Sequence, residues 1–191
     1  MTAGYVNDGA GAEIPHEENQ MILSDRLHEA LNRQIGHEIG ASMQYIQIAT
    51  YFDRQALVEL ARFFYRQSEE EREHAMKIVH FVTNADGTVA IPDVPAPRAD
   101  FGSAADAVRA ALDWEQQVTE QVYELVEIAK EDRNHIAERF LDWFVHEQFE
   151  EVSTMSALLQ VVERAGEQLL LVEEHLAREH GNVGGAPAPD A

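Results

Sequence analysis

Four glutamates and one histidine are the residues of this sequence best suited to chemistry. Each glutamate falls on the apolar stripe of a different predicted helix, near its middle, where a hydrophobic residue is expected. They are Glu38, Glu71, Glu115 and Glu151, with His74 one turn after Glu71. A carboxylate in an apolar interior is costly unless something pairs with its charge. Four of them at one depth, with one imidazole, predict a site for two metal ions.

The donor types favour iron at this site. Carboxylate oxygens hold both Fe(II) and Fe(III) and can bridge two ions, and a single imidazole leaves positions open for oxygen. Glu71 and His74 are three residues apart and share a helix face. Di-iron carboxylate bundles require this geometry.

Each glutamate taken alone has a second interpretation. It could lie at the boundary of the core, with its carboxylate in water. The Glu-x-x-His spacing is weak evidence, because it also occurs at Glu13 and His16, where Pro15 argues against a helix. Four boundary residues at matching depths are far less expected than one. The prediction of a metal site therefore depends on the four glutamates lying at the same depth along their helices.

Further polar residues lie close to these positions. Tyr45 is two turns after Glu38, and its ring should lean back toward the site; a redox role and a core tyrosine bonded to a glutamate both fit. Gln148 shares the face of Glu151 and could orient a ligand. Three acidic neighbours predict either a weaker adjacent metal site or a solvated acidic face: Glu70, Glu147 and Glu150.

Five helices must position these residues. Apolar residues at alternating steps of three and four are typical of helix bundles. Ser24 and Ser103 are suitable N-caps. We expect helices over about residues 24–52, 57–84, 104–130, 135–164 and 167–180.

The connection over residues 86–102 contains Pro92, Pro95 and Pro97 and cannot be helical. Helices of roughly 28 residues are about 42 Å long, and this connection can span about 56 Å. It can therefore run the whole length of the bundle. The predicted fold class is all-α, a four-helix bundle with one long crossover and a short fifth helix, as in ferritin-like bundles.

Composition bounds the remaining possibilities. The 191 residues include no cysteine, which excludes disulfides, iron–sulfur clusters and thiolate zinc sites. A net charge of −21 disfavours nucleic acid and anionic membranes as partners. Because no apolar run approaches the roughly 18 residues of a membrane span, we expect a soluble, cytoplasmic protein. Residues 1–20 and 181–191 are expected to be disordered around one domain over 21–180.

Several segments together resemble bacterial non-haem ferritins of the bacterioferritin-B type, over about residues 21–180. They are LNRQIGHEIGASMQYIQIATYFD, SEEEREHAM, WEQQVTEQV and LDWFVHEQFEEV. The resemblance implies one iron on Glu38, Glu71 and His74. It implies a second iron on Glu71 as bridge, Glu115 and Glu151, with Gln148 close by. A third would lie on Glu70, Glu147 and Glu150 with Glu151 shared, and Tyr45 matches the tyrosine beside the centre.

The sequence differs from three related families at positions that define them. Haem-containing bacterioferritins carry a second Glu-x-x-His where this chain has Gln148-Phe-Glu-Glu151, and a haem-ligating methionine where it has Arg72. No haem is therefore expected. Rubrerythrins add a cysteine iron site, which a cysteine-free chain cannot build. The DNA-protecting mini-ferritins place their ligands across a subunit interface and lack the fifth helix.

The resemblance implies an iron-storage ferroxidase. It would oxidise Fe(II) with O2 or H2O2 at a di-iron centre and store ferric mineral inside a homo-oligomeric shell of 24 subunits, the fifth helix lining the four-fold axis. The alternative on the same bundle is a manganese catalase or a di-iron oxidase with an organic substrate. A metal-free helical interaction protein is the third hypothesis.

Overall fold

The computed structural model describes residues 22–183, which form five helices and no strand. The helices are α1 (Asp25–Asp53), α2 (Val58–Asn84), α3 (Ala104–Glu131), α4 (His135–Ala165) and α5 (Leu169–Val183). The predicted all-α fold is confirmed, and the last helix extends into the tail that was expected to be disordered. Residues 1–20, also expected to be disordered, lie outside the described residues, as does the remainder of that tail.

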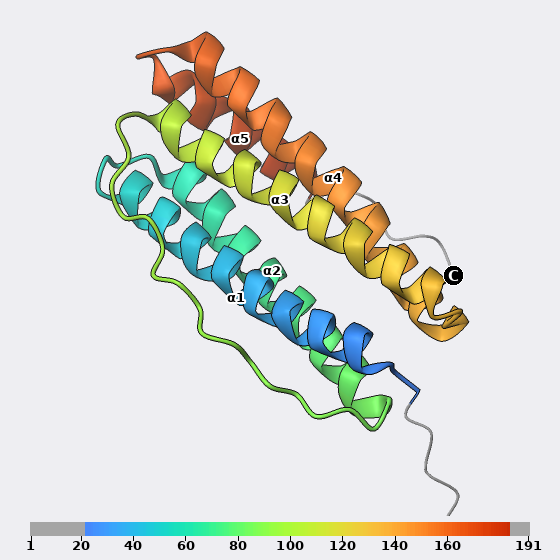
Figure 1. The fold of residues 1–191 in the computed structure, drawn as a ribbon. Helices are drawn as coiled ribbons and strands as arrows, with labels where there is room; N and C mark the ends of the chain where they lie inside the picture. Colours follow the sequence, from blue (N-terminus) through green and yellow to red (C-terminus); the bar gives the residue numbers. More distant parts are fainter. Residues whose placement is uncertain (1–21, 184–191) are drawn as a thin grey trace, which may run out of the picture.

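The four long helices form a bundle in which α1 packs on α2 and on α3, and α3 packs on α4. The short helix α5 contacts α2 and α4 at one end. Figure 1 shows the crossover running along the outside of α1 from the end of α2 to the start of α3. The predicted full-length crossover is therefore present.

Side chains cap the starts of three long helices, and a different element caps the fourth. The hydroxyls of Ser24 and Ser103 accept hydrogen bonds at the starts of α1 and α3, as predicted, and Asn134 does the same for α4. The N-cap residue of α2, Leu57, makes no such bond. The first turn of α2 is capped instead by Glu173 of α5, which accepts from the backbone N–H groups of Glu59 and Leu60 at 2.8 and 2.9 Å.

The crossover is fixed to α1 by two amide side chains. The oxygen of Asn32 accepts from the Ala90 N–H at 2.8 Å. Gln44 accepts from the N–H of Arg98 at 2.8 Å and donates to its carbonyl at 3.1 Å. Between them the crossover lies so close to α1 that a Cβ on Gly36 would come 2.4 Å from the Pro92 Cγ.

The hydrophobic core is divided into two clusters along the bundle axis. One contains Tyr45, Phe52 and Phe64 near α5, and the other contains Leu31, Ile78 and Phe144 toward the opposite end. On each long helix the buried glutamate lies between them, and so do His74, Gln67 and Gln148. This belt is the level at which the sequence placed its four glutamates.

Several large apolar side chains lie at the margin of the core. Phe81 and Phe140 are only partly buried, and their rings stack at 3.9 Å between centroids. In α5, Val172 and Leu176 pack on the bundle, whereas Leu170 is 72% exposed. A helix packed on one side only cannot bury residues on both faces.

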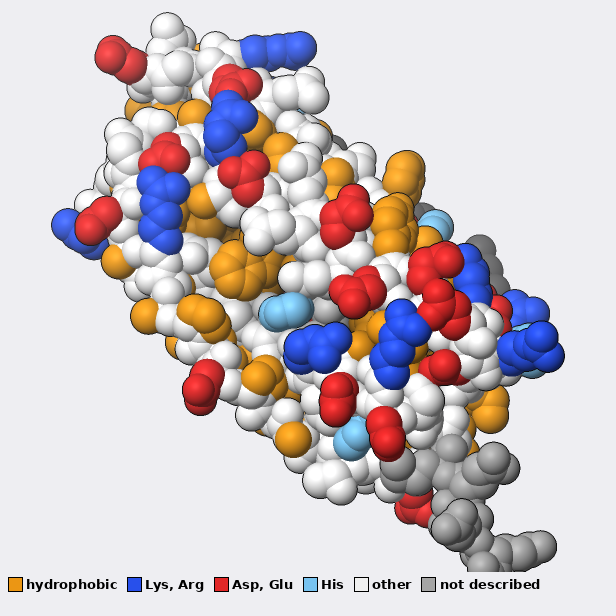
Figure 2. All heavy atoms as spheres, in the orientation of Figure 1, with side chains coloured by type: hydrophobic (Ala, Val, Ile, Leu, Met, Phe, Trp, Pro, Cys, Tyr) orange, Lys and Arg blue, Asp and Glu red, His pale blue; other side chains and the backbone are white. Residues whose placement is uncertain are grey.

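On the face of α1, α3 and the crossover, acidic and basic side chains are intermixed, with hydrophobic atoms exposed between them (Figure 2). Within residues 22–183, no helix is both long enough and apolar enough to cross a membrane.

Candidate metal centre

Each long helix contributes one buried carboxylate to the polar belt. Glu38 of α1, Glu71 of α2 and Glu115 of α3 are fully buried, and Glu151 of α4 is 4% exposed. His74, one turn after Glu71, is 3% exposed. None of them is a boundary residue with its head group in water, so that interpretation is wrong for all four glutamates.

These five side chains form two overlapping groups, which together we call the inner centre. In each group the donor atoms lie within 4.8 Å of one another. The first group is Glu38, Glu71 and His74, and the second is Glu71, Glu115 and Glu151. Because Glu71 belongs to both, its two oxygens can face two ions at once. A carboxylate shared by two donor groups can bridge two cations.

The hydrogen bonding of the inner centre is incomplete in a way that suits cations. Six buried donor or acceptor atoms around it have no hydrogen-bond partner: Glu38 Oε2, both oxygens of Glu71, His74 Nδ1, Glu115 Oε2 and Gln148 Nε2. His74 Nδ1 lies 3.5 Å from Glu71 Oε2. Buried polar atoms without partners are rare because each one costs stability. Four of the six are carboxylate oxygens, the donors that hard metal ions prefer.

Burial changes the protonation of these carboxyl groups. Loss of hydration raises the pKa of Glu115 to about 7 and that of Glu151 to about 9. The pKa of Glu71 is raised well above its usual range by burial and by the neighbouring carboxylates. Without metal, the centre therefore holds protons at neutral pH, and an arriving cation must displace them.

Tyr45 lies against this centre as the sequence indicated. It is fully buried, and its hydroxyl donates a hydrogen bond to Oε1 of Glu115. Burial and the nearby carboxylates raise the pKa of Tyr45 well above 10, so the phenol keeps its proton. Of the two roles left open, the bond to a glutamate is present.

Gln148 is 1% exposed beside Glu151 and is held by α3. Its Oε1 accepts a hydrogen bond from the Thr119 hydroxyl at 3.0 Å. The carbonyl oxygen retains a second lone pair with which it could approach a metal.

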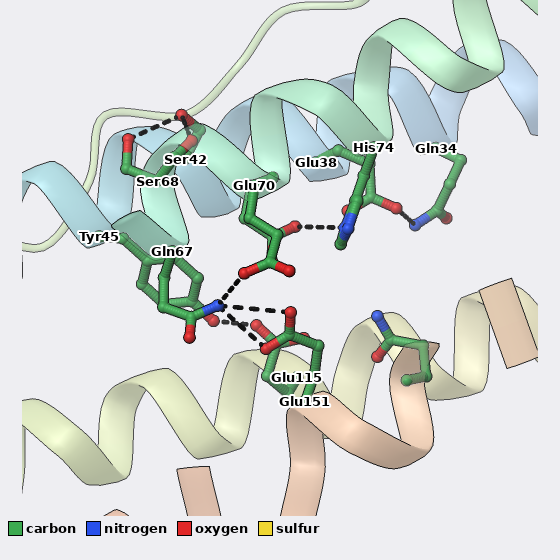
Figure 3. Close-up of polar contacts among 12 residues, drawn as sticks. Gln34, Glu38, Ser42, Tyr45, Gln67, Ser68, Glu70, His74, Glu115 and Glu151 are labelled. Carbon is green, nitrogen blue, oxygen red and sulfur yellow. Dashed lines mark hydrogen bonds and ion pairs between the residues drawn. The ribbon is translucent and has the colours of Figure 1, made fainter. Parts of the chain in front are cut away.

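Two buried amides at the site were not predicted as site residues. Gln34 of α1 donates to Glu38 Oε1 at 2.9 Å. Gln67 of α2 donates to Glu70 at 3.0 Å and to both oxygens of Glu151 at 3.2 and 3.3 Å (Figure 3). A sequence signal was available, since each lies one turn before a core glutamate on the same helix face.

A second group of donors lies beside the inner centre, and we call it the outer cluster. It consists of Glu70, His74, Glu147 and Glu151, with donor atoms within 4.8 Å of one another. Glu70 is exposed and Glu147 partly so, and Glu70, His74 and Glu147 line a pocket of about 400 Å³ between α2 and α4. Glu150 is not in this group; its carboxylate lies 3.5 Å from Nε2 of His146 on the surface.

Residues 28–165 match the family described as Ferritin-like domain, which is most of the chain. The chain belongs to the ferritin-like family. Ferritin BfrB of Mycolicibacterium smegmatis is 40% identical over 174 residues, covering 91% of this chain and 96% of that protein. The bacterial non-heme ferritin of Staphylococcus aureus is 36% identical over 158 residues, covering 81% and 95% of the two chains.

Solved ferritin structures share the fold. An open pore ferritin from the archaeon Archaeoglobus fulgidus superimposes with a TM-score of 0.79 at 32% identity, covering 82% of this chain and 97% of that one. The resemblance found in the sequence is thus confirmed. Within this ferritin-like bundle, the inner centre occupies the level where all four long helices meet.

Proposed function

We propose that this protein stores iron, and that the inner centre is a ferroxidase site which oxidises Fe(II) to Fe(III) with O2 or H2O2. The observation that carries the proposal is the pair of donor groups sharing Glu71, whose buried oxygens lack hydrogen-bond partners. Membership of the ferritin-like family supports it independently.

In this proposal Fe(II) is a substrate that passes through the inner centre. One ion is held by Glu38, Glu71 and His74, and the second by Glu71, Glu115 and Glu151, with Gln148 beside it. Protons leave the buried carboxyl groups as the ions bind. Each Fe(II) then gives up one electron, so that one O2 and two protons yield one H2O2. Two adjacent ions allow this two-electron step without free superoxide.

The surroundings of the inner centre have supporting roles. The Tyr45 hydroxyl keeps Glu115 oriented, and a redox role for this tyrosine is part of the proposal. The outer cluster would receive Fe(III) on its way to a mineral store. The third position would then use Glu70, Glu147 and Glu151, with Glu150 reaching it only after leaving His146.

The store would be the cavity of a homo-oligomeric shell of 24 subunits, in keeping with the likeness to known ferritins. The exposed Leu170 and Leu171 of α5 provide an apolar surface for contacts between subunits. A cytoplasmic location belongs to the same proposal.

The main alternative is another di-metal oxidoreductase on the same bundle. A di-iron oxidase with an organic substrate needs an apolar pocket at the metals. The pocket that reaches His74 is lined instead mainly by charged and titratable side chains: Glu70, Glu73, Lys77, His80 and Glu147. Such a pocket suits a small cation better than an organic molecule.

The bridge can be tested by replacing Glu71 with glutamine. Glu71→Gln keeps the shape of the side chain and replaces a carboxyl that burial holds neutral with a neutral amide, so the fold should persist. We expect aerobic Fe(II) oxidation, followed by ferric absorbance, to slow by roughly 100-fold or more, since even residues that only support a ligand contribute 10–100-fold in metal affinity or activity.

The matched control is Glu69→Gln, an exposed glutamate two residues earlier on α2. It should oxidise Fe(II) at the normal rate. An unchanged rate in Glu71→Gln would show that the inner centre is not the site of oxidation. If iron altered neither the melting temperature nor the absorbance of the normal protein, the metal-free interaction hypothesis would be favoured.

A further inference from the structure

Gln67 connects the inner centre to the outer cluster. It is 6% exposed and projects from α2 one turn before Glu71. Its Nε2 lies 3.0 Å from Oε2 of Glu70 and 3.2–3.3 Å from both oxygens of Glu151. Figure 3 shows this amide between Glu70 of α2 and Glu151 of α4.

The chemistry of the two carboxyl groups explains why an amide stands here. Ionised carboxylates only accept hydrogen bonds, and the amide nitrogen has two hydrogens to give. When the outer cluster takes up an ion, Glu70 and Glu151 must both be ionised to act as ligands, and the two like charges then resist the close approach that binding requires. A neutral donor placed between them offsets the repulsion without occupying a metal position.

The hydrogen bond from Gln67 to Glu151 affects both groups of metal ligands. Glu151 belongs to both the inner centre and the outer cluster, whereas Glu70 belongs to the outer cluster only. A side chain that holds these two together therefore favours the orientation of Glu151 that faces outward. The pocket between α2 and α4 opens on the same side.

We propose that Gln67 is a positioning residue that assembles the outer cluster by holding Glu70 and Glu151 in ligating orientation. An ion that has reached Glu151 at the inner centre then finds Glu70 already placed beside it. This inference rests on the proposed function only for the identity of the ion: the outer cluster would bind iron on its way to the store.

A matched comparison is available within the chain. Gln34 of α1 is a buried amide one turn before a core glutamate, as Gln67 is, and its side chain donates to Glu38 alone. Glu38 belongs to the inner centre and not to the outer cluster. Gln34→Met and Gln67→Met each remove a buried amide donor at similar side-chain length, on opposite sides of the site.

The test is an anaerobic calorimetric titration of the assembled protein with Zn(II), which has no redox chemistry and isolates binding. The outer class of sites is identified as the one that Glu147→Gln weakens, since Glu147 belongs only to the outer cluster. We expect Gln67→Met to weaken this class by about 10–100-fold, the usual effect of removing a group that orients a ligand. Gln34→Met should weaken the tighter inner class and leave the outer class unchanged.

Unchanged outer affinity in Gln67→Met, or the same outer loss in Gln34→Met, would overturn the inference. Gln67→Leu repeats the test with a second side chain, and the melting temperature of each metal-free variant monitors folding. The two proposals can fail separately. A normal protein that binds Zn(II) as described but does not oxidise Fe(II) removes the ferroxidase function and leaves the role of Gln67 standing.

Discussion

At the scale of single residues, the inner centre exchanges protons for cations. The carboxyl groups of Glu71, Glu115 and Glu151 have raised pKa values because burial removes the hydration of the charged form. A neutral carboxyl is tolerated in the core, and a metal ion permits the charged form by supplying the opposite charge. The same side chains are thus stable in the empty state and become ligands on binding.

This exchange predicts how the stability of the metal-free protein depends on pH. In the unfolded chain these carboxyls titrate near 4.5, whereas in the folded protein Glu115 titrates at about 7 and Glu151 at about 9. The folded state binds more protons over this interval, so the free energy of unfolding falls as pH rises. We expect the melting temperature to drop by on the order of 10 °C or more between about pH 5 and pH 9.

Saturating Zn(II) should reverse that drop, because the metal replaces the lost protons. In the variant carrying both Glu115→Gln and Glu151→Gln, two of the responsible groups no longer titrate, and the melting curve should depend less on pH. If the melting temperature of that variant depended on pH as steeply as that of the normal protein, other groups would be responsible.

At the scale of elements, α5 completes the bundle by capping another helix. The first N–H groups of a helix have no partner within it, and the start of α2 lacks a side-chain cap of its own. Glu173 of α5 supplies the acceptor through two hydrogen bonds. A carboxylate at this end is also favoured by the helix dipole. The position of α5 is therefore fixed by polar contacts as well as by Val172 and Leu176.

Replacing Glu173 with alanine should loosen α5 without disturbing the inner centre. Loss of an N-terminal cap costs about 1–2 kcal/mol, which corresponds to roughly 5–30-fold in a local opening equilibrium. Hydrogen exchange of the α5 amides should accelerate by about that factor, while the α1 amides keep their protection. Glu174→Ala is the control, since Glu174 pairs only within α5, with Arg178 at 3.7 Å. Equal exchange rates in the two variants would contradict the capping role.

At the scale of the whole molecule, the exposed apolar residues of α5 bear on assembly. Leu170 and Leu171 are 72% and 53% exposed, although the same helix buries Val172 completely. Large apolar side chains grouped on one surface are typical of sites covered by another protein. In the proposed shell that protein is a second copy of this chain.

Changing both leucines to aspartate should therefore prevent the shell from closing while leaving each bundle folded. The normal 21.5 kDa chain should give particles of about half a megadalton. The variant should give smaller species, measured by light scattering after gel filtration. Its helix content by circular dichroism should stay normal. A full-size particle from the variant would show that this surface is not needed for assembly.

The sequence by itself determined the helices, the crossover and the depth of the buried carboxylates. These features depend on periodicity, proline positions and N-caps, which act over a few residues and can be read along the chain. Counting residues from each helix end placed Glu38, Glu71, Glu115 and Glu151 near the middle of their helices. Helices of similar length that pack side by side have their middles at the same level, so the four carboxylates meet.

Only the tertiary structure decided which side chains meet across helices. The bonds from Gln67 to Glu151, from Thr119 to Gln148 and from Glu173 to α2 join different helices. Each depends on the rotation and axial register of two helices to within an ångström or so, the tolerance of a hydrogen bond. Periodicity assigns a residue to a face and leaves that register open. For the same reason Glu150, close in sequence to the ligands, lies outside the cluster, whereas Gln67 lies between its carboxylates.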